Sequence, residues 1–152
     1  MPPPLTIRTA DLSDVERLAR FNERMAAETE DKDLDAETVR AGVRHMIEAP
    51  DRGFYLLAER GGKGVGSLMI TTEWSDWRNG TFWWIQSVYV HPEARRQGVY
   101  ASLHSEVQSR AEAAEDVCGL RLYVEKDNRA ARDTYAALGM TETSYRMYEE
   151  DV

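Results

Sequence analysis

The sequence predicts a protein of the α/β class, and two observations support this prediction. Apolar residues recur at helical spacing in some segments and alternate in others, in the order strand, two helices, three antiparallel strands, helix, strand, helix and strand. A strand that ends at Val90 also runs through a short basic turn directly into a helix. With 152 residues and 42% hydrophobic content, the chain is expected to form one domain over residues 1–152.

Each element has a local signal. Residues 11–14 offer caps for the first helix, a charged link at 31–35 precedes the second, and Pro50 ends it. The glycines of the segment 61–64 supply the backbone angles of a hairpin turn. The expected strands are 5–9, 54–59, 65–72, 82–90, 120–124 and 143–148. The expected helices are 15–25, 36–49, 97–111 and 128–139.

The most informative segment joins the strand that ends at Val90 to the helix that follows Gly98. The first N–H groups of a helix have no partner within it, and together with the helix dipole they favour an anion. Arg95 and Arg96 add positive charge, and Gly98 has no side chain where the backbone must approach a phosphate. This junction therefore predicts a pyrophosphate-binding turn.

The same turn resembles the acyl-CoA pyrophosphate loop of the GCN5-related N-acetyltransferase (GNAT) family. The family motif Arg/Gln-x-x-Gly-x-Gly/Ala reads here Arg95-Arg96-Gln97-Gly98-Val99-Tyr100. Tyr100 departs from the motif, and its bulky side chain either points away from the phosphates or narrows the loop. The resemblance implies that the backbone of residues 88–90 pairs with pantetheine like an added strand. The residues it assigns to acetyl-CoA are Val88, Tyr89, Val90, Arg95, Arg96, Gln97, Gly98, Val99, Tyr100 and Asn128.

A second segment resembles the Asn-x-x-Ala-x-x-x-Tyr-x-x-x-Gly-Phe signature of the same family. It begins at Asn128 and ends with Gly139-Met140, so Met140 replaces the Phe. The residues alone predict a helix that Asn128 caps and Gly139 ends. Its inward face would carry Ala131, Tyr135 and Leu138. The resemblance implies that Tyr135 is the catalytic acid, whereas the residues alone also allow a core tyrosine.

The resemblance covers almost the whole chain and implies a GNAT-like, mostly antiparallel sheet flanked by about four helices. Its fourth and fifth strands would splay apart around pantetheine. The implied reaction is direct transfer of an acetyl group from acetyl-CoA to a primary amine of a small molecule, an amino acid or a protein, in a ternary complex. An amide at Val90 or its neighbour would stabilise the oxyanion, and Tyr135 would protonate the leaving thiolate. A CoA-binding module without turnover is the alternative, and the acyl length stays open.

The general base is the step at which the family pattern fails. The strand where many relatives carry a carboxylate has Trp84 and Gln86, and neither accepts a proton at neutral pH. Glu73, at the end of the neighbouring strand, is the nearest catalytic candidate, directly or through water. Glu28 and Glu30, in the expected loop after the first helix, are further candidates. Each of these three is otherwise a solvated surface carboxylate.

Four tryptophans lie between residues 74 and 84. Trp83 and Trp84 point to opposite faces of a sheet, so at least one of them is expected in the core. A ring beside Glu73 can hold an ammonium group by cation–π attraction. The expected acceptor-binding residues are Glu28, Glu30, Trp74, Trp77 and Trp84. A hydrophobic plug or a homodimer contact is the alternative role of the exposed rings.

Composition limits the partners. The net charge of -8 argues against a nucleic-acid surface and is compatible with a cationic acceptor. The three histidines are scattered without metal-ligand spacing, so no metal is expected. No apolar run approaches the roughly 20 residues that cross a bilayer, and the N-terminus does not resemble a signal peptide. A lone cysteine, Cys118, fits a reducing compartment, so we expect a cytoplasmic protein without membrane contact.

Overall fold

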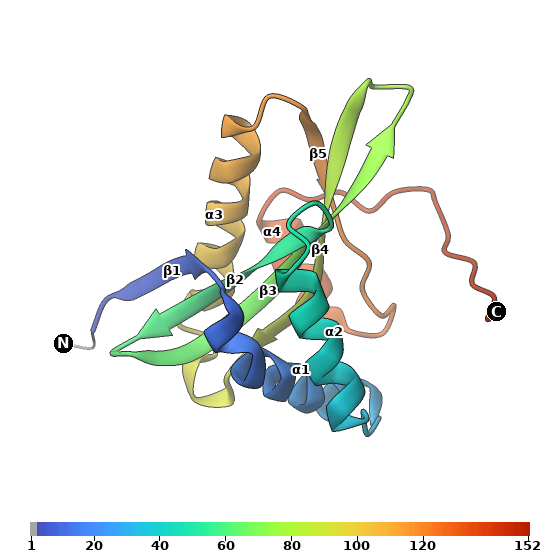
Figure 1. The fold of residues 1–152 in the computed structure, drawn as a ribbon. Coiled ribbons are helices and arrows are strands. Elements are labelled where there is room, and N and C mark those ends of the chain that lie inside the picture. Colours follow the sequence, from blue (N-terminus) through green and yellow to red (C-terminus); the bar gives the residue numbers. More distant parts are fainter. Residues whose placement is uncertain (1–2) are drawn as a thin grey trace. The chain divides into compact units, whose positions relative to one another are not determined.

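The computed structural model describes residues 3–152, which fall into two compact parts. The first part ends at Leu122, and the second runs from Tyr123 to Val152. The first part contains a five-stranded sheet and three helices, and the second contains the fourth helix (Figure 1). The site residues of the turn and of the sheet therefore belong to the first part, and Asn128 and Tyr135 to the second.

The sheet is mixed and mostly antiparallel, as predicted. Its strands lie in chain order, the first four pair antiparallel with one another, and the fourth and fifth pair parallel. The strands are β1 (Leu5–Thr9), β2 (Gly53–Arg60), β3 (Lys63–Ser75), β4 (Gly80–Val90) and β5 (Val117–Arg121). Gly61 and Gly62, with φ of 59° and 77°, form the predicted β2–β3 turn.

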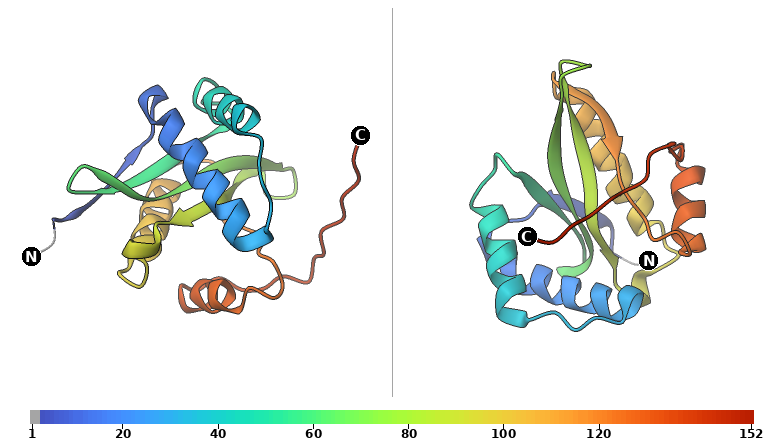
Figure 2. Two further views of the ribbon diagram at one scale, coloured as in Figure 1. Left: turned by 90° about the horizontal axis from the view of Figure 1, so that it is seen from below. Right: turned by 90° about the vertical axis from the view of Figure 1, so that its right-hand side faces the viewer.

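Helices cover both faces of this sheet. In Figure 2, α1 and α2 lie on one face and α3 lies on the other. The helices are α1 (Val15–Glu30), α2 (Ala36–Ile47), α3 (Val99–Ala113) and, in the second part, α4 (Arg129–Ala137). The predicted apolar stripe of α3 is confirmed, because Val99, Leu103 and Val107 are buried. Two hydrophobic clusters result, one beneath α1 and α2 and the other beneath α3.

The parallel strands separate partway along β4. The last residue pair between β4 and β5 is Trp84 with Arg121, whereas β4 continues to Val90. A register shift against β3 falls just beyond this point, and Ser87 there has a φ of 52°. Such a bulge bends a strand and increases its twist. The predicted splay of the fourth and fifth strands is therefore confirmed, and one edge of β4 is left without a strand neighbour in the described chain.

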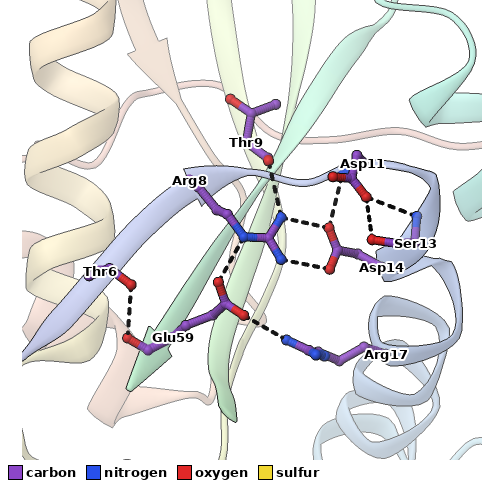
Figure 3. A network of polar contacts seen from close by, with 8 residues as sticks. All are labelled: Thr6, Arg8, Thr9, Asp11, Ser13, Asp14, Arg17 and Glu59. Carbon is purple, nitrogen blue, oxygen red and sulfur yellow. Dashed lines mark hydrogen bonds and ion pairs between the residues drawn. The ribbon is translucent and has the colours of Figure 1, made fainter. Parts of the chain in front are cut away.

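A polar network fastens α1 to the sheet (Figure 3). Arg8 of β1 donates both Nη atoms to the carboxylate of Asp14, each at 2.8 Å, and its Nε to Glu59 at 2.7 Å. Arg17 of α1 also donates to Glu59, at 3.1 Å. The guanidinium of Arg8 holds the pKa of Asp14 and of Glu59 below their usual values. Asp14 also completes the predicted cap by accepting from the N–H of Asp11.

Three predicted elements differ most from the structure, and the first is α1, which continues five residues beyond its predicted end at residue 25, to Glu30. β5 begins and ends three residues earlier than predicted, at Val117 and Arg121. The predicted final strand at 143–148 is wrong, because this segment has no ladder partner within residues 3–152. Tyr145 and Met147 in this segment are exposed. Alternation describes a half-buried strand only where a neighbouring strand supplies the hydrogen bonds.

Candidate active site

The turn before α3 presents the backbone groups that an anion requires. Gly98 is the N-cap of α3 in a left-handed conformation, with a φ of 77° and no side-chain cap. The N–H of Ser102 donates to the carbonyl of Gly98 at 3.0 Å, so the three preceding N–H groups of the helix have no helical acceptor. Arg96 also has a positive φ, 62°. The turn thus has the local geometry that the sequence predicted, while its role in binding pyrophosphate stays a prediction.

The two arginines of this turn differ in their partners. Arg95 donates its Nε to the carbonyl of Val90 at 2.9 Å and its Nη2 to Glu28 at 2.5 Å. Arg96 is exposed and forms no ion pair with any residue between 3 and 152. Arg95 therefore fixes the turn, and Arg96 carries the guanidinium that is available to a ligand. Glu28 and Glu30 lie in the last turn of α1 rather than in a loop, and Glu30 pairs with Lys32.

Two further residues of the motif form hydrogen bonds within the protein. Gln97 accepts from Arg60 at 2.7 Å and donates to the carbonyl of Glu93 at 3.0 Å. The hydroxyl of Tyr100 lies 3.0 Å from Nδ1 of His104, one turn further along α3. His104 is buried, and burial lowers its pKa. Of the two orientations open to Tyr100, the structure has the one directed along the helix, away from its N-terminus.

Residues 88–90 form the end of β4 beyond its last pair with β5. Val88 and Val90 pack against the cluster beneath α3, whereas Tyr89 faces α1 and its ring lies 5.0 Å from that of Phe21. The Tyr89 hydroxyl is buried without a hydrogen-bond partner in the described chain. Because the edge toward β5 has no strand neighbour here, the backbone of this segment can accept an added strand-like ligand.

Glu73 lies where β4 and β5 begin to separate. Its Oε1 accepts from Nε1 of Trp84 at 3.0 Å and from Nη1 of Arg121 at 2.8 Å. These three residues come from β3, β4 and β5. Beside them, Gln86 donates to the hydroxyl of Thr71 at 2.7 Å. The structure thus brings together Glu73 and Trp84, both named from the sequence, and adds a cation that the sequence analysis missed.

The alternation of residues around Arg121 in the sequence indicates which face of the sheet its side chain lies on. It stands between Leu120 and Leu122, both of which pack against the cluster beneath α3. A charged residue between two core-facing leucines of a strand points to the opposite face of the sheet. Arg121 also stacks on Phe82, with its guanidinium carbon 3.6 Å from the ring centroid. The strand pattern therefore predicts the face of the sheet on which this arginine lies, but it does not predict the contact with Glu73.

The remaining tryptophans divide between core and surface. Trp83 packs edge-on against Phe54 at 5.4 Å, which confirms that one of the central pair lies in the core. Trp74 and Trp77 are 61% and 87% exposed. Adjacent residues of a strand point to opposite faces, so Trp74 does not share the face of Glu73. The structure therefore does not gather Glu73, Trp74 and Trp77 into one cluster.

The second part of the chain contains the other predicted motif. Oδ1 of Asn128 caps α4 by accepting from the N–H of Ala131 at 3.2 Å, and Gly139 follows the helix with a φ of 96°. Both were predicted. Ala131, Tyr135 and Leu138 are the half-buried residues of the segment 129–138. Burial raises the pKa of Tyr135, so its phenol keeps its proton at neutral pH.

Within residues 3–152, no group of three His, Cys, Asp or Glu side chains is arranged to hold a metal ion. No helix in the same range is long and apolar enough to cross a membrane.

The parallel strands β4 and β5 thus separate in the same part of the chain in which β4 leads into the uncapped N-terminus of α3. Residues 13–140 match the model of the Acetyltransferase (GNAT) family. The chain therefore belongs to this family, whose members transfer acyl groups.

The structure also resembles solved structures. It shares 42% identity and a TM-score of 0.91 with a possible acetyltransferase from Clostridium difficile 630, over 97% of each chain. A predicted acetyltransferase from Clostridium acetobutylicum, solved with acetyl-CoA, has the same fold at 16% identity, a TM-score of 0.79 and 97% and 96% coverage. A ribosomal-protein-alanine N-acetyltransferase from Brucella melitensis has it at 17% identity, a TM-score of 0.78 and 98% and 99% coverage. None of the curated proteins compared with the chain matches it.

Proposed function

We propose that this protein transfers an acetyl group from acetyl-CoA to a primary amine of a small molecule, an amino acid or a protein, by direct transfer in a ternary complex. The observation that carries the proposal is the turn before α3, where Gly98 leaves the first helical amides uncapped beside Arg96, which forms no ion pair within residues 3–152. Residues 1–152 would act as one N-acetyltransferase domain. The lone thiol of Cys118 is consistent with action in the cytoplasm.

Acetyl-CoA would bind along β4 and the turn. The amides at the start of α3 and the guanidinium of Arg96 would hold the pyrophosphate, and the free edge of residues 88–90 would pair with pantetheine. Asn128, whose Oδ1 caps α4, would contribute its Nδ2 as a donor. No metal takes part in the proposed reaction.

The chemistry would then use two side chains. Tyr135, which keeps its proton because burial raises its pKa, would protonate the CoA thiolate as the thioester C–S bond breaks. A backbone N–H near the end of β4 would stabilise the oxyanion. Glu73 would remove the proton of the amine through water, using Oε2, because its Oε1 already accepts two hydrogen bonds.

A specific observation also favours the alternative of a CoA-binding module without turnover. Glu73 is held in an ion pair with Arg121 and also accepts from Trp84, which is a structural role between strands that would leave the amine without a base. The amine would then have to react from its neutral fraction, helped only by its position in the complex.

One experiment separates the two functions. Release of free thiol from acetyl-CoA is measured with a panel of amines, amino acids and peptides, while CoA binding is titrated calorimetrically. Acceptor-dependent thiol release supports the transferase. Saturable CoA binding without thiol release from any acceptor supports the binding module, and the absence of CoA binding overturns both.

The exposed tryptophans admit a proposal of their own. Trp74 and Trp77 at the tip of the β3–β4 hairpin would bind the acceptor or form a homodimer contact. Sedimentation equilibrium of the wild type and of the double variant Trp74→Ala/Trp77→Ala distinguishes these roles. A dimer that dissociates in the variant supports the contact, whereas an unchanged mass combined with a raised KM for the acceptor supports recognition.

A further inference from the structure

A hollow of about 370 Å3 lies beside α1, outside the residues assigned above to acetyl-CoA. Its walls include Arg17, Arg20 and Arg24 of α1, Gly64 at the start of β3, and His91 after β4. The spacings of three and four residues place the three arginines on one side of α1, each about one turn from the next. Three guanidinium groups thus face one hollow in a chain whose net charge is -8.

The ion pairs near the hollow leave part of this charge uncompensated. Arg17 is paired with Glu59 at 3.1 Å, and Glu16, which also lines the hollow, is paired with Arg40 at 2.5 Å. Arg20 and Arg24 form no ion pair with any residue that the structure describes. The hollow therefore keeps two unpaired guanidinium groups, which are the side chains best suited to a planar or tetrahedral oxyanion.

His91 also lines the hollow and adds a donor. Its Nδ1 accepts from the N–H of Glu93 at 3.2 Å, so its Nε2 carries the proton and can donate. Gly64 shapes the wall near Arg17. A Cβ at this position would lie 2.6 Å from Cδ of Arg17, so a larger residue would displace the arginine side chain.

We propose that this hollow binds a small molecule through a phosphate group, at a site separate from the pyrophosphate turn. Arg20 and Arg24 would neutralise the charge, and Nε2 of His91 would donate to a phosphate oxygen. A volume of about 370 Å3 suits a ligand of small-metabolite size. The shared chemistry is that of a phosphate monoester or free phosphate, and it goes beyond acetyl transfer.

Titration with inorganic phosphate at constant ionic strength tests the proposal. The arginine Nε–H and backbone amide signals of the full chain are followed by NMR, with and without saturating CoA. We expect saturable shifts at residues lining the hollow that persist in the presence of CoA. The variant Arg20→Ala/Arg24→Ala is expected to weaken phosphate binding at least tenfold. The control Arg52→Ala removes an exposed arginine that directly precedes β2 and does not line the hollow, and it is expected to leave phosphate binding unchanged.

The outcomes separate this site from the proposed acetyl-CoA site. Shifts that are linear, or equal in both variants, indicate screening only and overturn the proposal. Phosphate binding that disappears with saturating CoA and in Arg96→Ala also overturns it, since the phosphate then occupies the turn. If the protein binds CoA but phosphate does not bind in the hollow, the phosphate site is overturned and the proposed function is unaffected. If a sugar phosphate binds more tightly than inorganic phosphate, the occupant is a phosphate ester.

Discussion

Arg95 and Glu28 are 67 positions apart in the sequence and form a hydrogen-bonded ion pair of 2.5 Å between the turn before α3 and the last turn of α1. Both side chains are more than a third exposed. Because water screens the two charges, this ion pair contributes little to the free energy of unfolding. Its effect is instead positional, because Arg95 is held at the same time by the carbonyl of Val90. The neighbouring Arg96 has no such partner in the described chain and is free to meet a ligand.

The two arginines are therefore expected to respond differently to substitution. Arg96→Ala should weaken CoA binding about tenfold, with a larger effect at low salt, because a charge that contacts phosphate is screened by ions. Arg95→Ala should lower CoA affinity with little salt dependence, because Arg95 acts by fixing the turn, and should change the melting temperature of the apoprotein little. Calorimetric titration at two salt concentrations and thermal denaturation measure both effects. Equal salt dependence in the two variants would contradict this division of roles.

The buried His104 makes stability depend on pH. Burial lowers its pKa in the folded state, so the unfolded chain binds a proton more readily. Its contribution is present above the unfolded pKa of about 6.5 and is lost as the pH falls below it. We expect the unfolding free energy of the wild type to decrease from pH 7.5 to 5.5 more steeply than that of His104→Gln. Urea denaturation across this range measures the difference, and parallel curves would refute it.

The partner of His104 gives a related prediction at fixed pH. Tyr100→Phe removes the hydroxyl that lies 3.0 Å from Nδ1 of His104, so this buried ring nitrogen loses its hydrogen-bond partner. An unsatisfied buried polar group costs about 1–3 kcal/mol. We expect this loss in unfolding free energy with CoA affinity unchanged, since the ring points along α3. A large loss of CoA affinity at unchanged stability would instead mean that Tyr100 contacts CoA.

Local signals and long-range contacts differ in how far the sequence reveals them. Three features depend only on residues a few positions apart in the sequence, and the structure has all of them. They are the N-cap of α4, the glycine turn at 61–62 and the apolar stripe of α3. The pairs Glu73–Arg121 and Glu28–Arg95 join residues 48 and 67 positions apart. Such pairs depend on sheet register and helix position, which no local pattern specifies. The wrong final strand has the same origin, because a strand depends on a partner elsewhere in the chain.

The carboxylate of Asp14 is expected to matter for stability despite its distance in sequence from every motif. It is 2% exposed and accepts two hydrogen bonds from Arg8 and one from the N–H of Asp11. Asp14→Asn leaves this network incomplete and should reduce the unfolding free energy by about 2–3 kcal/mol at pH 7. Glu16→Gln, which disrupts an exposed ion pair with Arg40, is the matched control and should change it little.

The pH dependence of the same variant provides a check on the cause. Because Arg8 holds the pKa of Asp14 below its unfolded value of about 4, the contribution is present above that pH and is lost as the pH falls through the folded pKa. The wild type and Asp14→Asn should therefore converge in stability at acid pH. A difference that stays constant down to pH 2 would mean that packing, rather than charge, is responsible.

The proposed acid, Tyr135, leads to the most direct kinetic test. A phenol ordinarily keeps its proton at neutral pH, and burial raises the pKa of Tyr135 further, so its hydroxyl has a proton to give to a departing thiolate. Tyr135→Phe should lower kcat about 100-fold while CoA affinity changes less than about twofold, because the lost interaction acts only as the C–S bond breaks. Tyr145→Phe removes an exposed hydroxyl from the same part of the chain and should leave kcat unchanged. The decline of kcat at alkaline pH, where the phenol ionises, should be present in the wild type and absent in Tyr135→Phe. An alkaline decline that persists in the variant would assign the proton donor to another group.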